Sequence, residues 1–160
     1  PTPHPLHYPG YPAGTNIAFR KNIFTALGGF DCELGRSGEA LQSGEETELC
    51  LRIERAGLCI VHVPDAVVNH CVHEKRLTKE WVKDRSHWQG ISSAIIERKY
   101  FPYSRLLLKA LIYLAFTLSA KPIAFLSSLV GCRKVAFYCE CQFLLCKSYL
   151  KRAWTRHDQT

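Results

Sequence analysis

The sequence predicts an α/β fold over about the first 100 residues, followed by a helical region. Three observations lead to this prediction. Capping signals and helical spacing mark helices at 21–27, 44–56 and 78–98, short β-branched runs mark strands at 58–63 and 66–70, and long apolar stretches follow Pro102. A chain of 160 residues that is 47% hydrophobic is long enough to bury the core of one domain.

The first part of the chain contains a short helix between two irregular segments. Residues 1–13 hold five of the eight prolines, so we expect them to be extended and without regular structure. A helix over 21–27 is expected to end at Gly28 and Gly29, because glycine accepts the left-handed conformation found at helix ends. Residues 31–42 form a predicted polar loop, and loops of that length are usually functional or mobile.

The next segment predicts a helix with an acidic beginning. Ser43 and Glu46 have the spacing of a capping box, which predicts a helix over 44–56 that Gly57 ends. Its buried stripe is expected at Leu49, Ile53 and Ala56. The charged side chains that we expect to face water are Glu48, Arg52 and Arg55.

Two strands and a long helix follow in the prediction. The strands cover 58–63 and 66–70, with a turn at Pro64 and Asp65 between them. Thr78 is expected to cap a helix that runs to Arg98. The large apolar side chains along one face of that helix are Trp81, Trp88, Ile91 and Ile95.

The tail beyond Pro102 is strongly apolar. Lys109 and Lys121 interrupt it, and the longest uncharged runs, 110–120 and 122–132, have 11 residues each. A helix needs about 20 apolar residues to cross a bilayer, so neither run spans one alone. Because lysines can extend to the lipid headgroups, we expect helices that associate with the membrane interface; a helical hairpin packed on itself is the alternative.

Charge is distributed unevenly along the chain. Residues 1–73 carry 5 Lys and Arg against 8 Asp and Glu, whereas residues 74–160 carry 16 against 6. The acidic half is therefore expected to carry chemistry, and the basic half to meet an anionic surface such as a membrane. A non-catalytic basic module for a membrane surface or a nucleic acid is the rival hypothesis. The sequence has no RNA-binding aromatic motif and no DNA-reading helix pattern, so no nucleic-acid partner is expected.

The eight cysteines favour reduced thiols in a cytoplasmic setting. Each of the first four stands alone among apolar neighbours, as small core residues do: Cys32, Cys50, Cys59 and Cys71. The last four, at 132, 139, 141 and 146, contain no C-x-x-C pair and are poorly spaced for zinc. The sequence has no methionine and no signal-peptide pattern, so we expect a piece of a longer protein.

Four motifs occur in a fixed order: GTNIAFR at 14–20, LGGFD at 27–31, GEETELCLR at 44–52 and PDAVVNH at 64–70. Together they resemble the second half of family 2 glycosyltransferases of the GT-A fold, over about residues 10–95. Each motif alone is a weak signal, and four in order are a strong one. The resemblance implies a partial GT-A domain that lacks its N-terminal Rossmann-like half. Residues 1–100 would be its acceptor-side part, and 101–160 a helical, membrane-associated tail.

The resemblance implies inverting transfer of a sugar from a nucleotide-sugar donor to an acceptor hydroxyl. The acceptor would be a lipid, a polysaccharide or a protein, in cell-envelope polysaccharide or glycolipid synthesis at the inner face of the membrane. Such a reaction needs a base for the hydroxyl proton, and a cation or basic side chains for the leaving diphosphate. This chain alone is expected to be inactive, because the donor-binding half would lie upstream.

Glu46 takes the place of the aspartate in the family's Glu-Asp motif, which implies that it is the general base. Its side chain is one methylene longer than that of the usual aspartate. The alternative role for Glu46 is the return arm of the capping box to Ser43, since both roles need the same carboxylate. Glu45 is expected to support the site by orienting the loop or the acceptor.

The remaining site residues are also implied by the resemblance. His70 would be a ligand of Mg²⁺ or Mn²⁺, with the other ligands in an Asp-x-Asp motif that this chain lacks. A hydrogen-bonded histidine at a strand end is the alternative. Residues expected to bind substrate are Asn16 and Arg20 in the acceptor pocket, and Arg85 and Trp88 near the donor diphosphate and the acceptor. For the last pair, the alternative is a helix face with Trp88 in the core.

Overall fold

The computed structural model describes residues 2–155, and its contacts divide the chain into two compact units. Unit 1 contains the chain up to Gly35 together with 44–72. Unit 2 contains 36–43 and the chain from His73 onward. The sequence predicted a boundary near residue 100, but the two units do not divide there. The helix that ends at residue 100 packs with the two helices that follow it, so all three belong to unit 2.

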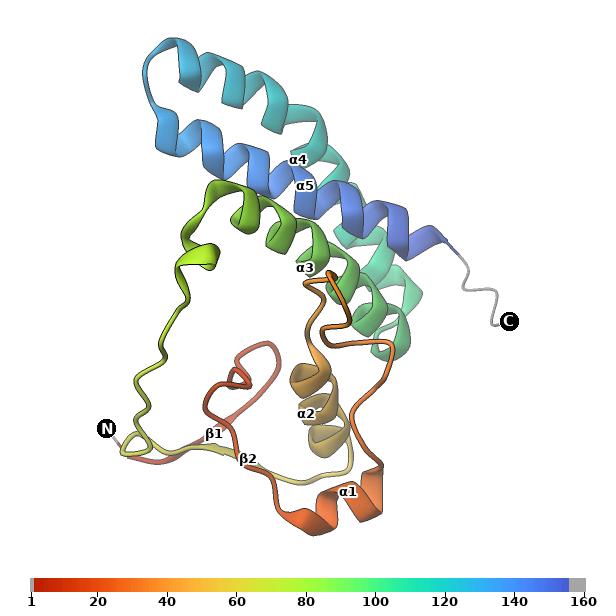
Figure 1. Cartoon of the computed structure of the whole chain (residues 1–160). Helices are drawn as coiled ribbons and strands as arrows, with labels where there is room; N and C mark the ends of the chain where they lie inside the picture. Colours follow the sequence, from red (N-terminus) through yellow and green to blue (C-terminus); the bar gives the residue numbers. More distant parts are fainter. Residues whose placement is uncertain (1, 156–160) are drawn as a thin grey trace. The chain divides into compact units, whose positions relative to one another are not determined.

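Unit 1 contains two helices and a two-stranded antiparallel sheet (Figure 1). Helix α1 (Lys21–Leu27) has the bounds that the sequence predicts, and Gly28 ends it with a φ of 84°. Helix α2 is Glu45–Arg55. Strand β1 (His4–Leu6) pairs with β2 (Ile60–His62), so that Pro5 lies opposite Val61.

Three local predictions for unit 1 are wrong. The capping box does not form: Gly44, with a φ of 108°, is the N-cap of α2, and no side chain caps that helix. Residues 66–70 form no strand, whereas β1 lies within the segment expected to be irregular. A strand needs a neighbour that completes its hydrogen bonds, and β2 finds that neighbour in the proline-rich segment, where an edge strand tolerates proline.

The core of unit 1 is built on α2. The buried apolar residues of α2 are Leu49, Cys50, Leu51 and Ile53. Ala56 is exposed, contrary to the predicted stripe, and three cysteines expected in the core, Cys32, Cys59 and Cys71, are exposed as well. Next to α1, the rings of Phe19, Phe24 and Phe30 meet edge to face at centroid distances of 5.5 to 6.1 Å.

Unit 2 is a helical assembly. A 3₁₀ turn, η1 (Glu74–Leu77), precedes α3 (Lys79–Tyr100), α4 (Tyr103–Leu129) and α5 (Arg133–Trp154). The predicted cap of α3 is confirmed, since the Thr78 hydroxyl accepts from the Trp81 amide at 3.2 Å. Helices α4 and α5 form a hairpin, and α3 lies along α5 (Figure 1).

The interior of unit 2 contains a buried charge. Glu97 is 1% exposed and accepts a hydrogen bond from the Tyr149 hydroxyl at 2.8 Å. Lys109 forms an ion pair with the same carboxylate. One of the two lysines expected to extend toward lipid headgroups is thus held inside the helical assembly, because a buried carboxylate requires a partner.

Helix α4 joins the two apolar runs that the sequence separates. It continues through Lys121 and Pro122 for 27 residues, about 40 Å at 1.5 Å per residue. Within residues 2–155 it is the one helix long and apolar enough to cross a membrane by length and composition, because it joins two runs that are each too short alone. Many of its large apolar side chains are exposed, among them Leu111, Leu118 and Phe125.

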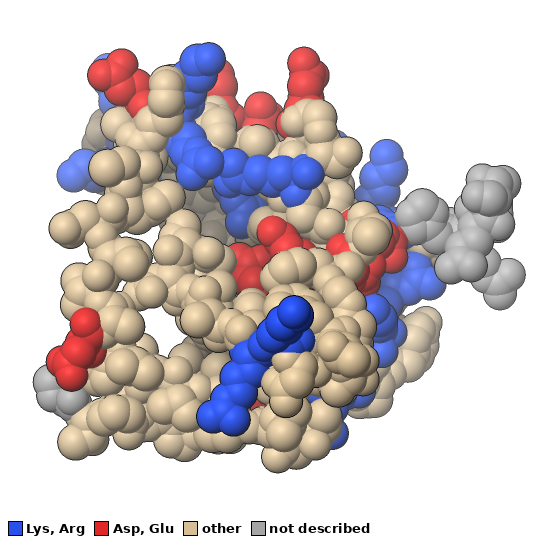
Figure 2. Space-filling model, turned by 60° about the horizontal axis from the view of Figure 1, so that its bottom comes forward, with Lys and Arg blue, Asp and Glu red and all other residues tan. Residues whose placement is uncertain are grey.

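Charged side chains on the face drawn in Figure 2 occur in small groups of both signs. Uncharged residues make up most of that face.

Candidate active site

Glu46 lies in the first turn of α2, and its two carboxylate oxygens differ in environment. Oε1 accepts a hydrogen bond from the Gly14 amide at 3.0 Å. Oε2 is buried and has no hydrogen-bond partner among the described residues. A carboxylate that is held through one oxygen while the other has no hydrogen-bond donor suits a group that accepts a proton from a ligand.

The close approach of Gly14 depends on its lack of a side chain. A Cβ atom built on Gly14 would lie 3.0 Å from Oε1 of Glu46, tighter than ordinary contact. Gly14 belongs to the first of the four motifs and Glu46 to the third. The glycine therefore allows its own amide to orient the carboxylate.

Glu45 is placed in a similar way at the beginning of the same helix. Its Oε2 is also buried without a hydrogen-bond partner in residues 2–155. The carboxyl carbon would lie 3.5 Å from a Cβ on Gly35, a glycine with a φ of 93°. Two buried carboxylate oxygens thus lie at the N-terminus of α2, where the helix dipole stabilises negative charge.

The first turn of α2 also influences a thiol beneath it. Cys50 is fully buried, and burial, followed by the nearby charge of Glu46, raises the pKa of its thiol to about 11. The thiol therefore stays protonated at neutral pH and adds no further negative charge to the site. Cys50 is not a nucleophile here.

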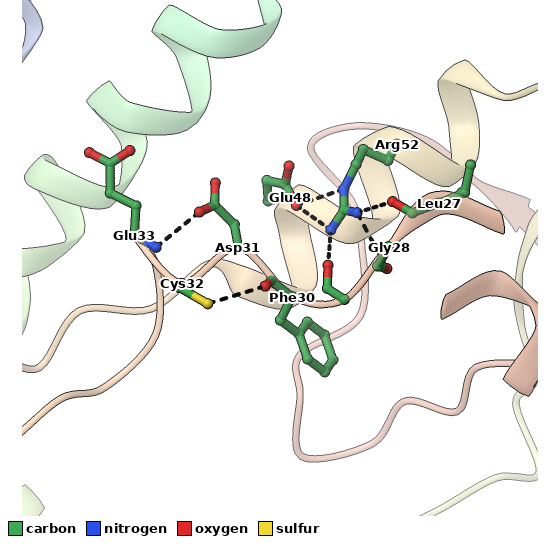
Figure 3. A network of polar contacts seen from close by, with 9 residues as sticks. Leu27, Gly28, Phe30, Asp31, Cys32, Glu33, Glu48 and Arg52 are labelled. Atoms are coloured by element: carbon green, nitrogen blue, oxygen red, sulfur yellow. Dashed lines mark hydrogen bonds and ion pairs between the residues drawn. The ribbon is translucent and has the colours of Figure 1, made fainter. Parts of the chain in front are cut away.

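Arg52 and Glu48 connect α2 to α1 (Figure 3). Glu48 is completely buried; its Oε2 accepts a hydrogen bond from Arg52 Nε at 2.9 Å and forms an ion pair with Nη2 at 2.8 Å. The guanidinium also donates to the carbonyls of Leu27 at 2.5 Å and Gly29 at 2.6 Å. The predicted exposure of Glu48 is therefore wrong, and Arg52 is half-buried, because its guanidinium is held between that carboxylate and the carbonyls at the end of α1.

Asp31 stabilises the loop after α1. Its Oδ1 accepts from the Glu33 amide at 2.9 Å, the short-range bond of an Asx turn (Figure 3). The second motif thus supports the loop backbone.

Glu54 at the far end of α2 organises a second polar cluster that the sequence analysis missed. It accepts hydrogen bonds from the Tyr11 hydroxyl, from His7 Nδ1 at 2.7 Å and from the Tyr8 amide at 3.3 Å. The hydrogen bonds from Tyr11 and His7 lower the pKa of Glu54. The pKa of Tyr11 is raised, first by burial of its hydroxyl and second by the hydrogen bond to Glu54. This cluster holds the N-terminal segment against α2.

The predicted acceptor-pocket and metal residues of unit 1 are all exposed. Asn16 donates from Nδ2 to the Ala66 carbonyl at 2.6 Å, which joins the first and fourth motifs. Arg20 is the N-cap residue of α1. His70 lies in an irregular segment, and among the described residues no three His, Cys, Asp or Glu side chains gather as a metal site would require.

The four motifs thus meet in one unit. The amide of Gly14 reaches Glu46, Asn16 reaches Ala66, and Arg52 reaches the carbonyls at 27–29. The partners of Gly14 and Asn16 lie 32 and 50 residues away. Glu48 and Arg52 stand at i and i+4, a spacing that allows an ion pair, but both were expected to face water. No local signal indicated the Gly14 amide.

Arg85 and Trp88 belong to unit 2. Both are half-buried on α3, and Arg85 Nη2 donates to the Ser43 hydroxyl at 2.7 Å. The Ser43 amide donates to the Ser92 hydroxyl at 3.2 Å, so the predicted capping serine instead attaches the 36–43 segment to α3. Trp88 contacts the ring of His87 edge to face. The substrate-binding roles of both residues stay predictions.

Comparison with known proteins identifies a glycosyltransferase among the relatives of this chain. This chain is 35% identical over 88 residues to the glucosyl-dolichyl phosphate glucuronosyltransferase of Haloferax volcanii. The match covers 54% of this chain and 28% of that enzyme, so the chain spans less than a third of its relative. No protein-family model and no solved structure matches the chain.

Proposed function

We propose that this chain is the acceptor-side part of an inverting glycosyltransferase of the family 2, GT-A type. It would help to transfer a sugar from a nucleotide-sugar donor to the hydroxyl of a glycolipid. Two things support this: the four motifs joined in unit 1, and the partial identity to an enzyme whose name describes sugar transfer to a dolichyl phosphate glycolipid.

The observation that carries the proposal is the state of Glu46. Its Oε1 is held by the Gly14 amide, and Oε2 is buried and has no partner within residues 2–155. A buried carboxylate oxygen without a donor is unfavourable, by about 1–3 kcal/mol or more. A hydroxyl that binds there and donates a hydrogen bond to this oxygen removes that cost, which favours binding of the hydroxyl.

The chemistry follows from that hydroxyl. The acceptor hydroxyl donates its proton to Oε2 of Glu46 while its oxygen attacks the anomeric carbon of the donor sugar. The new bond joins the acceptor oxygen to that carbon, and the bond from the carbon to the nucleoside diphosphate breaks. Because this is a single displacement from the opposite face, the configuration inverts.

The residues of this chain do not fit a complete metal site. His70 is exposed, and no other ligating side chains accompany it in the described part of the chain. We derive no step through a metal. A Mg²⁺ or Mn²⁺ ion that uses His70 and upstream carboxylates stays a prediction.

The helical tail would place the enzyme at a membrane, on its cytoplasmic face. Helix α4 exposes large apolar side chains along its length, and the second half of the chain is basic. Both properties favour an interface with anionic lipids. A glycolipid acceptor would be found at that interface.

Glu46→Gln in the complete enzyme that contains this chain tests the proposal. Without a base, kcat is expected to fall about 10²–10⁴-fold, while binding of the donor nucleotide is unchanged. Glu46→Asp, which restores the family's usual residue, is expected to keep transfer. Glu74→Gln, an exposed carboxylate in η1, is the matched control. An unchanged kcat for Glu46→Gln would assign Glu46 a structural role and remove it as the general base.

A further inference from the structure

A cavity of about 330 Å³ lies among α3, α4 and α5 within unit 2. Its volume lies at the lower end of the range of small-molecule sites. It is lined by Lys83 of α3, by Ala120, Lys121 and Ala124 of α4, and by Cys139, Glu140, Phe143 and Leu144 of α5. No part of the predicted active site contributes to it.

The cavity exists because two small residues occupy one face of α4. Ala120 and Ala124 are one turn apart, so their methyl groups leave a space that longer side chains would fill. Phe143 and Leu144 form the opposite wall. The resulting lining is largely apolar, which suits a hydrocarbon chain better than a sugar or a nucleotide.

Two lysines and one carboxylate supply the charge of this cavity. Lys83 is paired with Glu140 at 2.6 Å. Lys121 is exposed, and its Nζ lies 4.9 Å from the centroid of the Phe143 ring. Lys121 has neither a hydrogen bond nor an ion pair with any residue from 2 to 155. The cavity therefore keeps one positive charge that a bound anion can neutralise.

We infer that this cavity binds a lipid with a phosphate head and an aliphatic chain. The phosphate would pair with Lys121, and the first part of the chain would lie against Ala120, Ala124 and Phe143. The exposed apolar surface of α4 continues next to the cavity at Phe125, which is 64% exposed, and at Leu126, which is 60% exposed. This inference rests on the proposed function, because it names the lipid class that the transferase would use.

Photolabelling of the full chain in nanodiscs of neutral phosphatidylcholine tests the inference. The probes are a dodecyl phosphate and a dodecanol, each with a diazirine in the alkyl chain, and adducts are located by tandem mass spectrometry. The phosphate probe is expected to label 120–124 and 139–144. Lys121→Glu should reduce that labelling about tenfold, because a charge-assisted contact becomes a repulsion, while the dodecanol is little affected.

Two further variants separate the site from general effects. Ala124→Phe fills the cavity and should reduce labelling by both probes. Lys134→Glu, at an exposed lysine in the first turn of α5 outside the cavity, is the charge control and should label as the unmodified chain does. Circular dichroism of each variant checks that the helices are retained.

Equal labelling of Lys121→Glu and the unmodified chain would overturn the inference, as would adducts spread evenly along α4 with both probes. These outcomes are independent of the test of Glu46. Labelling can fail while Glu46→Gln abolishes transfer, which leaves the transferase proposal without this lipid site. If labelling succeeds and Glu46→Gln retains transfer, the lipid site is kept and Glu46 is removed as the general base.

Discussion

Gly90→Ala is expected to destabilise unit 2 because Gly90 lies against the backbone of α5. A Cβ on Gly90 would lie 3.0 Å from the Tyr149 amide nitrogen and 3.1 Å from the Leu145 carbonyl carbon, with the Leu145 oxygen closer still. No side-chain rotation relieves a clash with backbone atoms, so α3 has to move away from α5. Such overpacking costs up to about 3 kcal/mol, and alanine returns about 1 kcal/mol of helix propensity. The expected net loss of stability is about 2 kcal/mol.

Thermal unfolding followed by circular dichroism measures this loss. For a chain of 160 residues, about 2 kcal/mol corresponds to a fall in Tm of roughly 4–8 °C. Gly29→Ala is the matched control, since no atom lies within 4 Å of a Cβ at that position, and its stability should change by less than about 0.5 kcal/mol. A Tm for Gly90→Ala equal to or above that of the unmodified chain would refute the close contact of α3 with α5.

Two further predictions concern unit 1. Arg52→Ala leaves the buried Glu48 carboxylate without its cation and should cost about 3–5 kcal/mol in chemical denaturation; an effect below about 1 kcal/mol would contradict the ion pair. The folded-state pKa of Glu54 is lowered by its hydrogen bonds, so its contribution to stability is present above the ordinary glutamate pKa of 4.5 and is lost as the pH falls through the folded pKa. Glu54→Gln should therefore flatten the dependence of stability on pH below about 4.5, and an unaltered acid limb would disprove the role of the Tyr11 and His7 contacts.

Local signals predicted the helices well. The bounds of α1 follow from Gly28 at its end, and the beginning of α3 follows from the Thr78 hydroxyl, since each signal acts within one turn of the backbone. The capping box failed although its spacing was correct. Ser43 is bound to Arg85 and Ser92, and Glu46 to Gly14, so contacts between distant residues replaced the local bond.

The strands were predicted less well for a related reason. The run at 58–63 contains β2, but the partner strand came from a proline-rich segment with no strand pattern. Branched residues at 66–70 favour an extended backbone, yet a strand forms only where another strand completes its hydrogen bonds. Which segment supplies that partner is a property of the whole fold.

Residue types and order in the sequence alone determined the four motifs, the acidic cluster at 45–48, the caps of α1 and α3 and the apolar tail. Tertiary structure decided which oxygen of Glu46 is held by the Gly14 amide and which has no hydrogen-bond donor. It also decided that Glu48 is buried and paired with Arg52. The two apolar runs join in α4, which lines the cavity, and this too follows from the tertiary structure. The physical reason is the distance along the chain over which each kind of interaction acts. Caps and turns depend on neighbours within a few residues, whereas burial and hydrogen-bond partners depend on groups that only folding brings together.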